Sequence, residues 1–347
     1  MTVARSRKDN KEDTTGATGM RLRIIMTVAG VGGLALLIIL VMHSGVNDVA
    51  ATLGSAGWAL LWLIPVHIAP IALDAVGWRA LLHDHRQASL PYLSWIAAVR
   101  DSINSLLPVA RVGGEVAGVR LLMMRGVPGS ASAASVMVEV TLTLAVQFIF
   151  TLVGLGILLY YLSDHVAARL VILGLLVSLP LLIVFYLLQH RWGLFQLLER
   201  VLTALTGRKV LSLAGDPARL DEAIQHLYRR RGVLLTTALW QFAGLMAGAA
   251  ELWFTLWLLG HPISLPAAIM LESLAQAVQS AAFLVPGALG IQEGSFVLFG
   301  AATGLSPDVA LALSLAKRVR QVGFGIPSLL SWQWVEGRHL HRLLRRA

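Results

Sequence analysis

The chain has 347 residues, of which 56% are hydrophobic and 14% are charged, and its formal net charge is +9. A soluble domain carries about 25% charged residues, so this composition and the mean hydropathy of +0.72 argue against a soluble fold. The absence of cysteine excludes disulfides, a thiol nucleophile and a cysteine-ligated metal. The basic residues flank apolar runs, so we expect a membrane protein and no nucleic-acid partner.

Six apolar runs are each long enough to cross a bilayer, which takes about 20 helical residues. The first follows a basic tail, residues 1–22, and lacks a small-residue cleavage site, so we expect a retained helix and not a signal peptide. The predicted spans are residues 23–42, 57–82, 130–161, 166–189, 233–260 and 307–334.

The distribution of lysine and arginine predicts the orientation. These residues gather in the N-terminal tail, after the second span, in a polar loop at 190–231 and in the tail at 336–347. The other loops carry almost none, so the positive-inside rule places both termini in the cytoplasm. Within the 190–231 loop, helical periodicity at 192–205 and 217–228 predicts amphipathic helices at the membrane surface.

Two further apolar stretches, residues 91–126 and 266–304, are interrupted by proline, glycine and charge. A charged side chain at the centre of a lipid-facing span costs about 2.5–3.5 kcal/mol. A re-entrant hairpin that is buried in protein, or that lines a water-filled cavity, avoids much of this cost. The sequence therefore favours an all-α polytopic fold with six full spans and two re-entrant hairpins. Eight full spans would give the same orientation.

The two interrupted stretches resemble each other. In each, a proline precedes a glutamate by the same interval, as Pro108 precedes Glu115 and Pro286 precedes Glu293. The offset from Pro108 to Pro286 therefore equals the offset from Glu115 to Glu293. Further matches at nearly this offset predict an internal duplication.

The duplication divides the single transmembrane domain predicted at 23–335. Repeat 1 is expected at about 57–161 and repeat 2 at about 233–335. By the positive-inside rule, repeat 1 begins at the cytoplasmic side and repeat 2 at the outside, so the two copies are inverted. Inverted repeats with broken helices that meet near the midplane are typical of transporters.

Two groups of residues are candidates for the functional site. Broken segments free backbone groups and helix ends that can face a ligand. Among charges inside the membrane, arginine suits phosphate, while carboxylates suit cationic or polyhydroxy headgroups or carry protons. The first group comprises Pro108, Arg111, Gly113, Gly114, Glu115, Arg120, Pro286, Gly290, Glu293 and Gly294. The second group, for charge pairing or coupling, comprises Asp74, Arg100, Asp101, Glu139, Glu251, Glu272, Lys317 and Arg318.

We expect the two groups to line a polar cavity for a lipid headgroup. Arg111, Glu115 and Arg120 would shape one mouth of this cavity, and Glu293 would shape the other.

Near the middle of the cavity, Glu139 and Arg318 would gate or couple movement. Alternatively, Glu139 and Arg318 pair only to hold the helices together. No metal or cofactor is expected.

The residues from Pro108 to Arg120 and from Pro286 to Gly294 resemble the two signature segments of the lysylphosphatidylglycerol synthase transmembrane, or flippase-like, family. The stretch Asn-Ser-Leu-Leu-Pro-Val-Ala-Arg-Val-Gly-Gly-Glu is most similar to the branch associated with hopanoid biosynthesis. The resemblance implies a bacterial inner-membrane protein that moves or presents a lipid. Because the chain stops at Ala347 without an aminoacyl-transferase domain, lysyl transfer is not expected.

The leading hypothesis is a lipid flippase or transporter and not an enzyme. Its expected partners are membrane lipids, either hopanoid or phospholipid, and lipid-biosynthesis enzymes. Two alternatives remain: a membrane enzyme that modifies a lipid headgroup, and a non-catalytic scaffold for lipid-synthesis enzymes.

Overall fold

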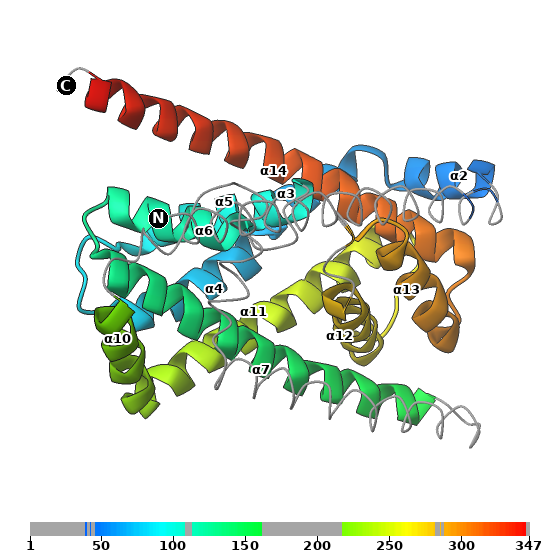
Figure 1. Ribbon diagram of the computed structural model, residues 1–347. Helices are drawn as coiled ribbons and strands as arrows, with labels where there is room; N and C mark the ends of the chain where they lie inside the picture. The colour runs from blue at the N-terminus through cyan, green and yellow to red at the C-terminus, as the bar shows by residue number, and fades with distance from the viewer. Residues whose placement is uncertain are drawn as a thin grey trace, which may run out of the picture.

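The computed structural model describes residues 46–107, 113–161, 217–281 and 288–344, together with residues 39, 42 and 285. Within these ranges every regular element is a helix, which confirms the all-α fold. The elements are α2 (Val46–Ala56), η1 (Gly57–Trp62), α3 (Leu63–Val66), α4 (Ile68–Leu81), α5 (Leu90–Leu106), α6 (Gly113–Met124), α7 (Gly129–Tyr161), α10 (Pro217–Arg229), α11 (Arg231–Leu258), α12 (Leu265–Ala281), α13 (Ile291–Gly300), η4 (Ala301–Thr303) and α14 (Pro307–Leu344) (Figure 1).

Three described helical stretches are long and apolar enough to cross a membrane: Val49–Leu81, Gly129–Tyr160 and Arg231–Leu258. They coincide with the spans predicted at 57–82, 130–161 and 233–260. The predicted spans at 23–42 and 166–189 lie outside the described residues, as do the N-terminal tail and most of the 190–231 loop.

The last predicted span is the greater part of α14, a helix of 38 residues. At 1.5 Å per residue it is about 57 Å long, enough to cross the ~30 Å hydrocarbon core with length to spare. Three basic residues interrupt its apolar face, and two of them, Lys317 and Arg320, are buried. Lys317 and Arg320 therefore lie against neighbouring helices, whereas α14 as a membrane span stays a prediction.

The two interrupted stretches each form a pair of short helices. Helices α5 and α6 make the first pair, and α12 and α13 make the second. Helix α6 has 12 residues and α13 has 10, so they are only about 18 Å and 15 Å long. Neither can cross a ~30 Å core by itself, and the number of full spans stays a prediction.

The duplication is visible in the turns that precede α7 and α14. Gly126 and Gly304 both adopt positive φ, +89° and +79°. The amide of Val127 donates to the carbonyl of Leu122, and the amide of Leu305 donates to the carbonyl of Gly300. Both bonds are typical of a helix C-terminal glycine cap, and they recur at the offset that separates Glu115 from Glu293.

The contacts between helices follow the same duplication. Contacts α4–α5, α5–α6 and α6–α7 in the first half match α11–α12, α12–α13 and α13–α14 in the second. Across the halves, α5 packs on α14 as α12 packs on α7, and α4 packs against its own counterpart α11. Helices α7 and α14 run in opposite directions (Figure 1). These are the relations of an inverted repeat.

The repeat begins earlier than the boundaries at 57 and 233 that the sequence suggested. Helix α2 packs on α14, and α10 packs on α7, so α2 and α10 occupy equivalent places ahead of the two halves. Helix α10 confirms the helix predicted at 217–228. Its Leu220 and Leu227 are buried in the core formed with α7 and its neighbours, so this face of α10 covers protein.

Glycine allows both contacts between the halves to be close. A methyl group at Gly154 of α7 would overlap the hydroxyl of Ser273 on α12. A methyl group at Gly325 of α14 would overlap Leu106 on α5. Helix α12 therefore packs on α7, and α5 packs on α14, at van der Waals distance. This close packing limits the positions that charged side chains on these helices can take.

Candidate functional site

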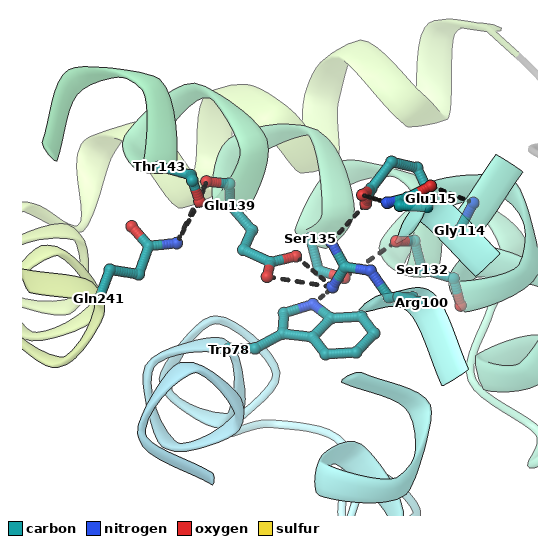
Figure 2. Close-up of polar contacts among 10 residues, drawn as sticks. Trp78, Arg100, Gly114, Glu115, Ser132, Ser135, Glu139, Thr143 and Gln241 are labelled. Atoms are coloured by element: carbon teal, nitrogen blue, oxygen red, sulfur yellow. Dashed lines mark hydrogen bonds and ion pairs between the residues drawn. The ribbon is translucent and has the colours of Figure 1, made fainter. Parts of the chain in front are cut away.

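The first charged network is centred on Arg100 of α5 (Figure 2). Its guanidinium donates to both oxygens of Glu139 on α7, at 3.0 and 2.7 Å, and also to Glu115 in the first turn of α6. The ring of Trp78 on α4 lies 4.6 Å from the guanidinium carbon. The buried Arg100 side chain of α5 thus contacts two carboxylates and an aromatic ring, which come from three other helices of the first half.

The end of α5 and the start of α6 hold Glu115 close to this cation. Asn104, near the end of α5, accepts a hydrogen bond from the amide of Gly114 at 2.9 Å and donates to Glu115 at 3.3 Å. A methyl group at Gly114 would lie 2.5 Å from the carbonyl oxygen of Arg100. Only glycine at this position lets the start of α6 approach α5 closely enough.

Two polar side chains extend the Arg100 network toward its neighbours. Asp74 of α4 is half-buried within electrostatic range of Arg100 and Glu139. Gln241 of α11 donates to Thr143 at 2.8 Å and to the Glu139 carbonyl at 3.3 Å (Figure 2). The network therefore reaches from the first half into the second.

The second network is centred on Glu293 of α13, whose side chain is fully buried. One of its oxygens accepts a hydrogen bond from Arg318 at 2.9 Å and another from Ser314 at 3.0 Å, both on α14. Arg318 also donates to the carbonyl of Ala288 at 3.4 Å. Ala288 has φ of +47°, a backbone conformation that L-residues rarely adopt. The hydrogen bond from Arg318 therefore stabilises an unusual turn.

A third ion pair joins α12 to α14. Lys317 donates to Glu272 at 2.5 Å, and Gln276 donates to the same carboxylate at 2.8 Å. Lys317 follows Glu139 at the same offset at which Glu293 follows Glu115. The pair between α5 and α7 in the first half thus recurs between α12 and α14 in the second, with the two charges exchanged.

A fourth cluster lies where the halves meet and includes a residue that the sequence analysis did not single out. His67, between α3 and α4, has Nδ1 at 2.8 Å from Glu251 and Nε2 at 3.5 Å from Asp101. Arg320 of α14 lies 3.2 Å from Glu251. The sequence did contain an indication for His67, because an ionisable residue in an apolar span is a functional candidate by default. Nearby prolines, which interrupt the helical hydrogen bonds there, strengthen it.

The predicted site residues do not all meet. Glu115 and Glu293 hold equivalent places, each the third residue of its short helix, but they belong to separate networks. Gly290 precedes α13 with φ of +73°, and a methyl group at Gly294 would meet nothing within 4 Å. Pro108, Arg111 and Pro286 lie outside the described residues.

The structure shows the bonding partners of three predicted site residues. Arg120 does not join Glu115; it donates to Glu336 near the end of α14 at 2.6 Å, and its side chain is half exposed. Glu139 bonds to Arg100 on α5, whereas Arg318 bonds to Glu293 on α13. The alternative in which Glu139 pairs with Arg318 is therefore not observed, and each of the two residues has a partner inside its own half.

Comparison with known proteins identifies the family. No match was found among curated proteins. Residues 24–328 match the family described as the lysylphosphatidylglycerol synthase TM region, and this segment contains both hairpins and all four charged clusters. The match and the apolar helices mark a membrane protein tied to lipid metabolism or transport. The chain is therefore a member of the lysylphosphatidylglycerol synthase TM region family.

Proposed function

We propose that this protein moves an amphipathic lipid across the membrane, with the headgroup passing between the two hairpins while the tails stay in the bilayer. The observation that carries this proposal is the equivalence of Glu115 and Glu293. Each stands in the first turn of a short helix after a broken segment, and each is held by an arginine inside the protein. In transporters built from inverted repeats, substrate sites lie at the starts of such broken helices.

The ion pairs suit a headgroup because they can be exchanged. Arg100 already bonds to two carboxylates, and its planar guanidinium can bind a pair of phosphate oxygens in the same way. A polyhydroxy headgroup could instead bond to the carboxylates that the arginine releases. When a headgroup replaces a carboxylate as the partner of Arg100, the buried charge stays compensated. Leaving that charge unpaired would cost several kcal/mol.

The two halves are not in the same state. The Glu115 side chain is 17% exposed and the Glu293 side chain is 0% exposed. In an inverted repeat, a difference between the halves is what opens the path to one side and closes it on the other. If the Glu115 site became buried and the Glu293 site became accessible, a headgroup would move from one leaflet to the other.

We further propose that the protein works in a bacterial inner membrane and that its lipid is a hopanoid or a phospholipid. Both proposals rest on the resemblance of the broken segments to the hopanoid-associated branch. The match at the family level supports a role in lipid handling. The identity of the lipid is determined by the experiment that follows.

Lipid movement can be measured with the purified full-length protein in vesicles that contain NBD-labelled phosphatidylglycerol. External dithionite destroys the label only in the outer leaflet, so loss beyond that pool reports lipid that has crossed. Wild type should exceed empty vesicles, and Glu115→Gln and Glu293→Gln should each slow the crossing. Glu222→Gln is the matched control, because Glu222 is exposed on α10.

The same vesicles separate the alternatives. Crossing equal to that of empty vesicles for this lipid and for a labelled polyhydroxylated hopanoid would refute the proposal. A chemically altered headgroup without movement would favour a modifying enzyme. Crossing that is unchanged in both glutamine variants would leave transport standing and refute the assigned site.

A further inference from the structure

His67 is the centre of a charged cluster that neither the proposed path nor the family match explains. It lies at the break between α3 and α4, and its ring edge faces the ring of Phe324 on α14 at a centroid distance of 5.0 Å. Each ring nitrogen faces a carboxylate, Nδ1 toward Glu251 of α11 and Nε2 toward Asp101 of α5. Elements from both halves thus converge on one imidazole.

The guanidinium of Arg320 competes for the same ring. Its Nη1 lies 3.0 Å from Nε2 of His67, contacts Nδ1 as well, and is 3.2 Å from Glu251. A carboxylate needs a ring nitrogen that carries a proton, whereas a guanidinium needs a ring nitrogen with a lone pair. One protonation state of His67 therefore cannot satisfy all of these neighbours.

The conflict defines two arrangements. A neutral His67 donates to one carboxylate and accepts from Arg320. A protonated His67 donates to both carboxylates and repels Arg320, which can then bond fully to Glu251. Within the described residues, Arg320 Nε and Glu251 Oε1 are buried without a hydrogen-bond partner, so both atoms have bonding capacity to spare. Lys317 is also within electrostatic range of Glu251, so a second cation helps to keep that carboxylate ionised.

Exposure falls across the cluster in one direction. The side chain of Asp101 is 41% exposed, that of His67 is 12% exposed and that of Glu251 is 2% exposed. Asp101 and Nε2 of His67 therefore lie on the accessible side of the cluster, and Glu251 lies at its buried end. Because the four residues sum to no net charge only when His67 is protonated, proton binding removes a buried negative charge.

The cluster occurs in only one of the two equivalent places that the duplication creates. By the offsets between matching helices, the counterparts of His67, Asp101 and Arg320 in the opposite halves are Gly244, Gln276 and Leu142. Gly244 packs against α4, and its added methyl group would lie 3.4 Å from the Pro70 carbonyl oxygen. The equivalent positions thus carry neither histidine nor arginine, so the duplication supplies this cluster only once.

We propose that His67, with Asp101, Glu251 and Arg320, is a proton-binding site whose occupancy sets the relative position of the two halves and so couples lipid movement to a proton gradient. This inference rests on the proposed transport function. A proton from water forms an N–H bond at the ring nitrogen, Arg320 moves from the ring to Glu251, and the same proton later returns to water. The contacts that change join α3 and α5 of one half to α11 and α14 of the other.

The site can be tested without any transport assay. In the full-length protein in lipid nanodiscs, ¹⁵N spectra of the histidine rings distinguish a neutral tautomer from an imidazolium. His67 can be assigned through its contact with the Phe324 ring. Between about pH 5 and 8, we expect His67 to change from imidazolium to a neutral ring, with an accompanying change in the Arg320 side-chain signals. A ring that keeps one form throughout this range would overturn the proposal.

Coupling is tested in vesicles with NBD-labelled phosphatidylglycerol and an imposed pH gradient. A gradient of about one pH unit should shift the steady-state leaflet distribution by up to about tenfold per coupled proton. His67→Gln should remove this response. The matched control is His261→Gln, an exposed histidine in the loop after α11, and it should keep the response.

The two tests separate the failure of each claim. If His67 titrates and the lipid does not cross, the transport function fails and the proton site stands. If the lipid crosses equally well with and without the gradient, coupling is overturned and the transport function stands. A gradient response that persists in His67→Gln would overturn the assignment of the coupled proton to His67, because glutamine cannot take up the proton.

Discussion

Replacement of Arg100 by glutamine should be among the most destabilising single changes in the described part of the protein. Arg100 compensates Glu115 and Glu139 at once and lies over the ring of Trp78. Glutamine is too short to reach both carboxylates and carries no charge. The change would leave two carboxylates close together in the protein interior.

The magnitude follows from burial. The side chains of Arg100 and Glu139 are 9% and 2% exposed, so the pair is a buried one. Breaking a buried pair by removing one partner costs about 3–5 kcal/mol, and loss of the cation–π contact adds about 0.5–2 kcal/mol. The exposed pair of Arg120 with Glu336 gives the contrast, because Arg120→Gln should cost about 1 kcal/mol or less.

The measurement is the free energy of unfolding in bicelles, obtained from reversible unfolding curves of the purified protein. Arg100→Gln should lose several times as much stability as Arg120→Gln. The double variant Arg100→Gln with Glu139→Gln should recover part of the loss, because one uncompensated carboxylate is gone. Equal losses for the two arginine variants would refute the view that the Arg100 network carries buried charge.

Three further predictions test the two short helices α6 and α13, the C-terminal end of α14 and the topology. Gly114→Ala should lower the free energy of unfolding clearly, because its methyl group would collide with the backbone of α5. Gly294→Ala should be tolerated, because its methyl group would meet nothing within 4 Å. Unfolding curves of the two variants measure the difference. Arg120→Glu should place like charges together and speed hydrogen exchange in the last turns of α14 by up to about fivefold. Because the chain lacks cysteine, Gln87→Cys and His261→Cys can be labelled singly, and impermeant reagent should reach them from opposite sides of the membrane.

The spans and the repeat were predictable because they depend on local properties of the sequence. A run of apolar residues forms a helix in lipid whatever its neighbours are, so 57–82, 130–161 and 233–260 could be identified directly. The glycine turns and Pro-to-Glu segments were recognisable because proline and glycine are the residues that commonly make such breaks. The equivalence of α2 and α10 was not predictable, since Val46–Ala56 and Pro217–Arg229 have little sequence in common.

The partners of the charged residues were not predictable from spacing. The offset from the start of α5 to the start of α12 is shorter than the offset from α7 to α14, by nearly one helical turn. A single offset applied to the whole repeat therefore misplaces residues along a helix. Which faces then meet depends on how the helices cross, and this is why Glu139 bonds to Arg100 and not to Arg318.

His67 was missed for a related reason. It stands in a span with no regular polar stripe, and its partners come from three other helices that are distant in sequence. Only the packing of α4 against α11, and of α3 against α14, brings Glu251 and Arg320 to its ring. A search for isolated ionisable residues beside prolines in apolar runs would have found it.

Crossing of NBD-labelled phosphatidylglycerol in vesicles that contain the purified protein tests the central claim most directly. The account predicts crossing above that of empty vesicles, slowed by Glu115→Gln and by Glu293→Gln and unchanged by Glu222→Gln. Crossing no faster than in empty vesicles, with this lipid and with a labelled hopanoid, would contradict it.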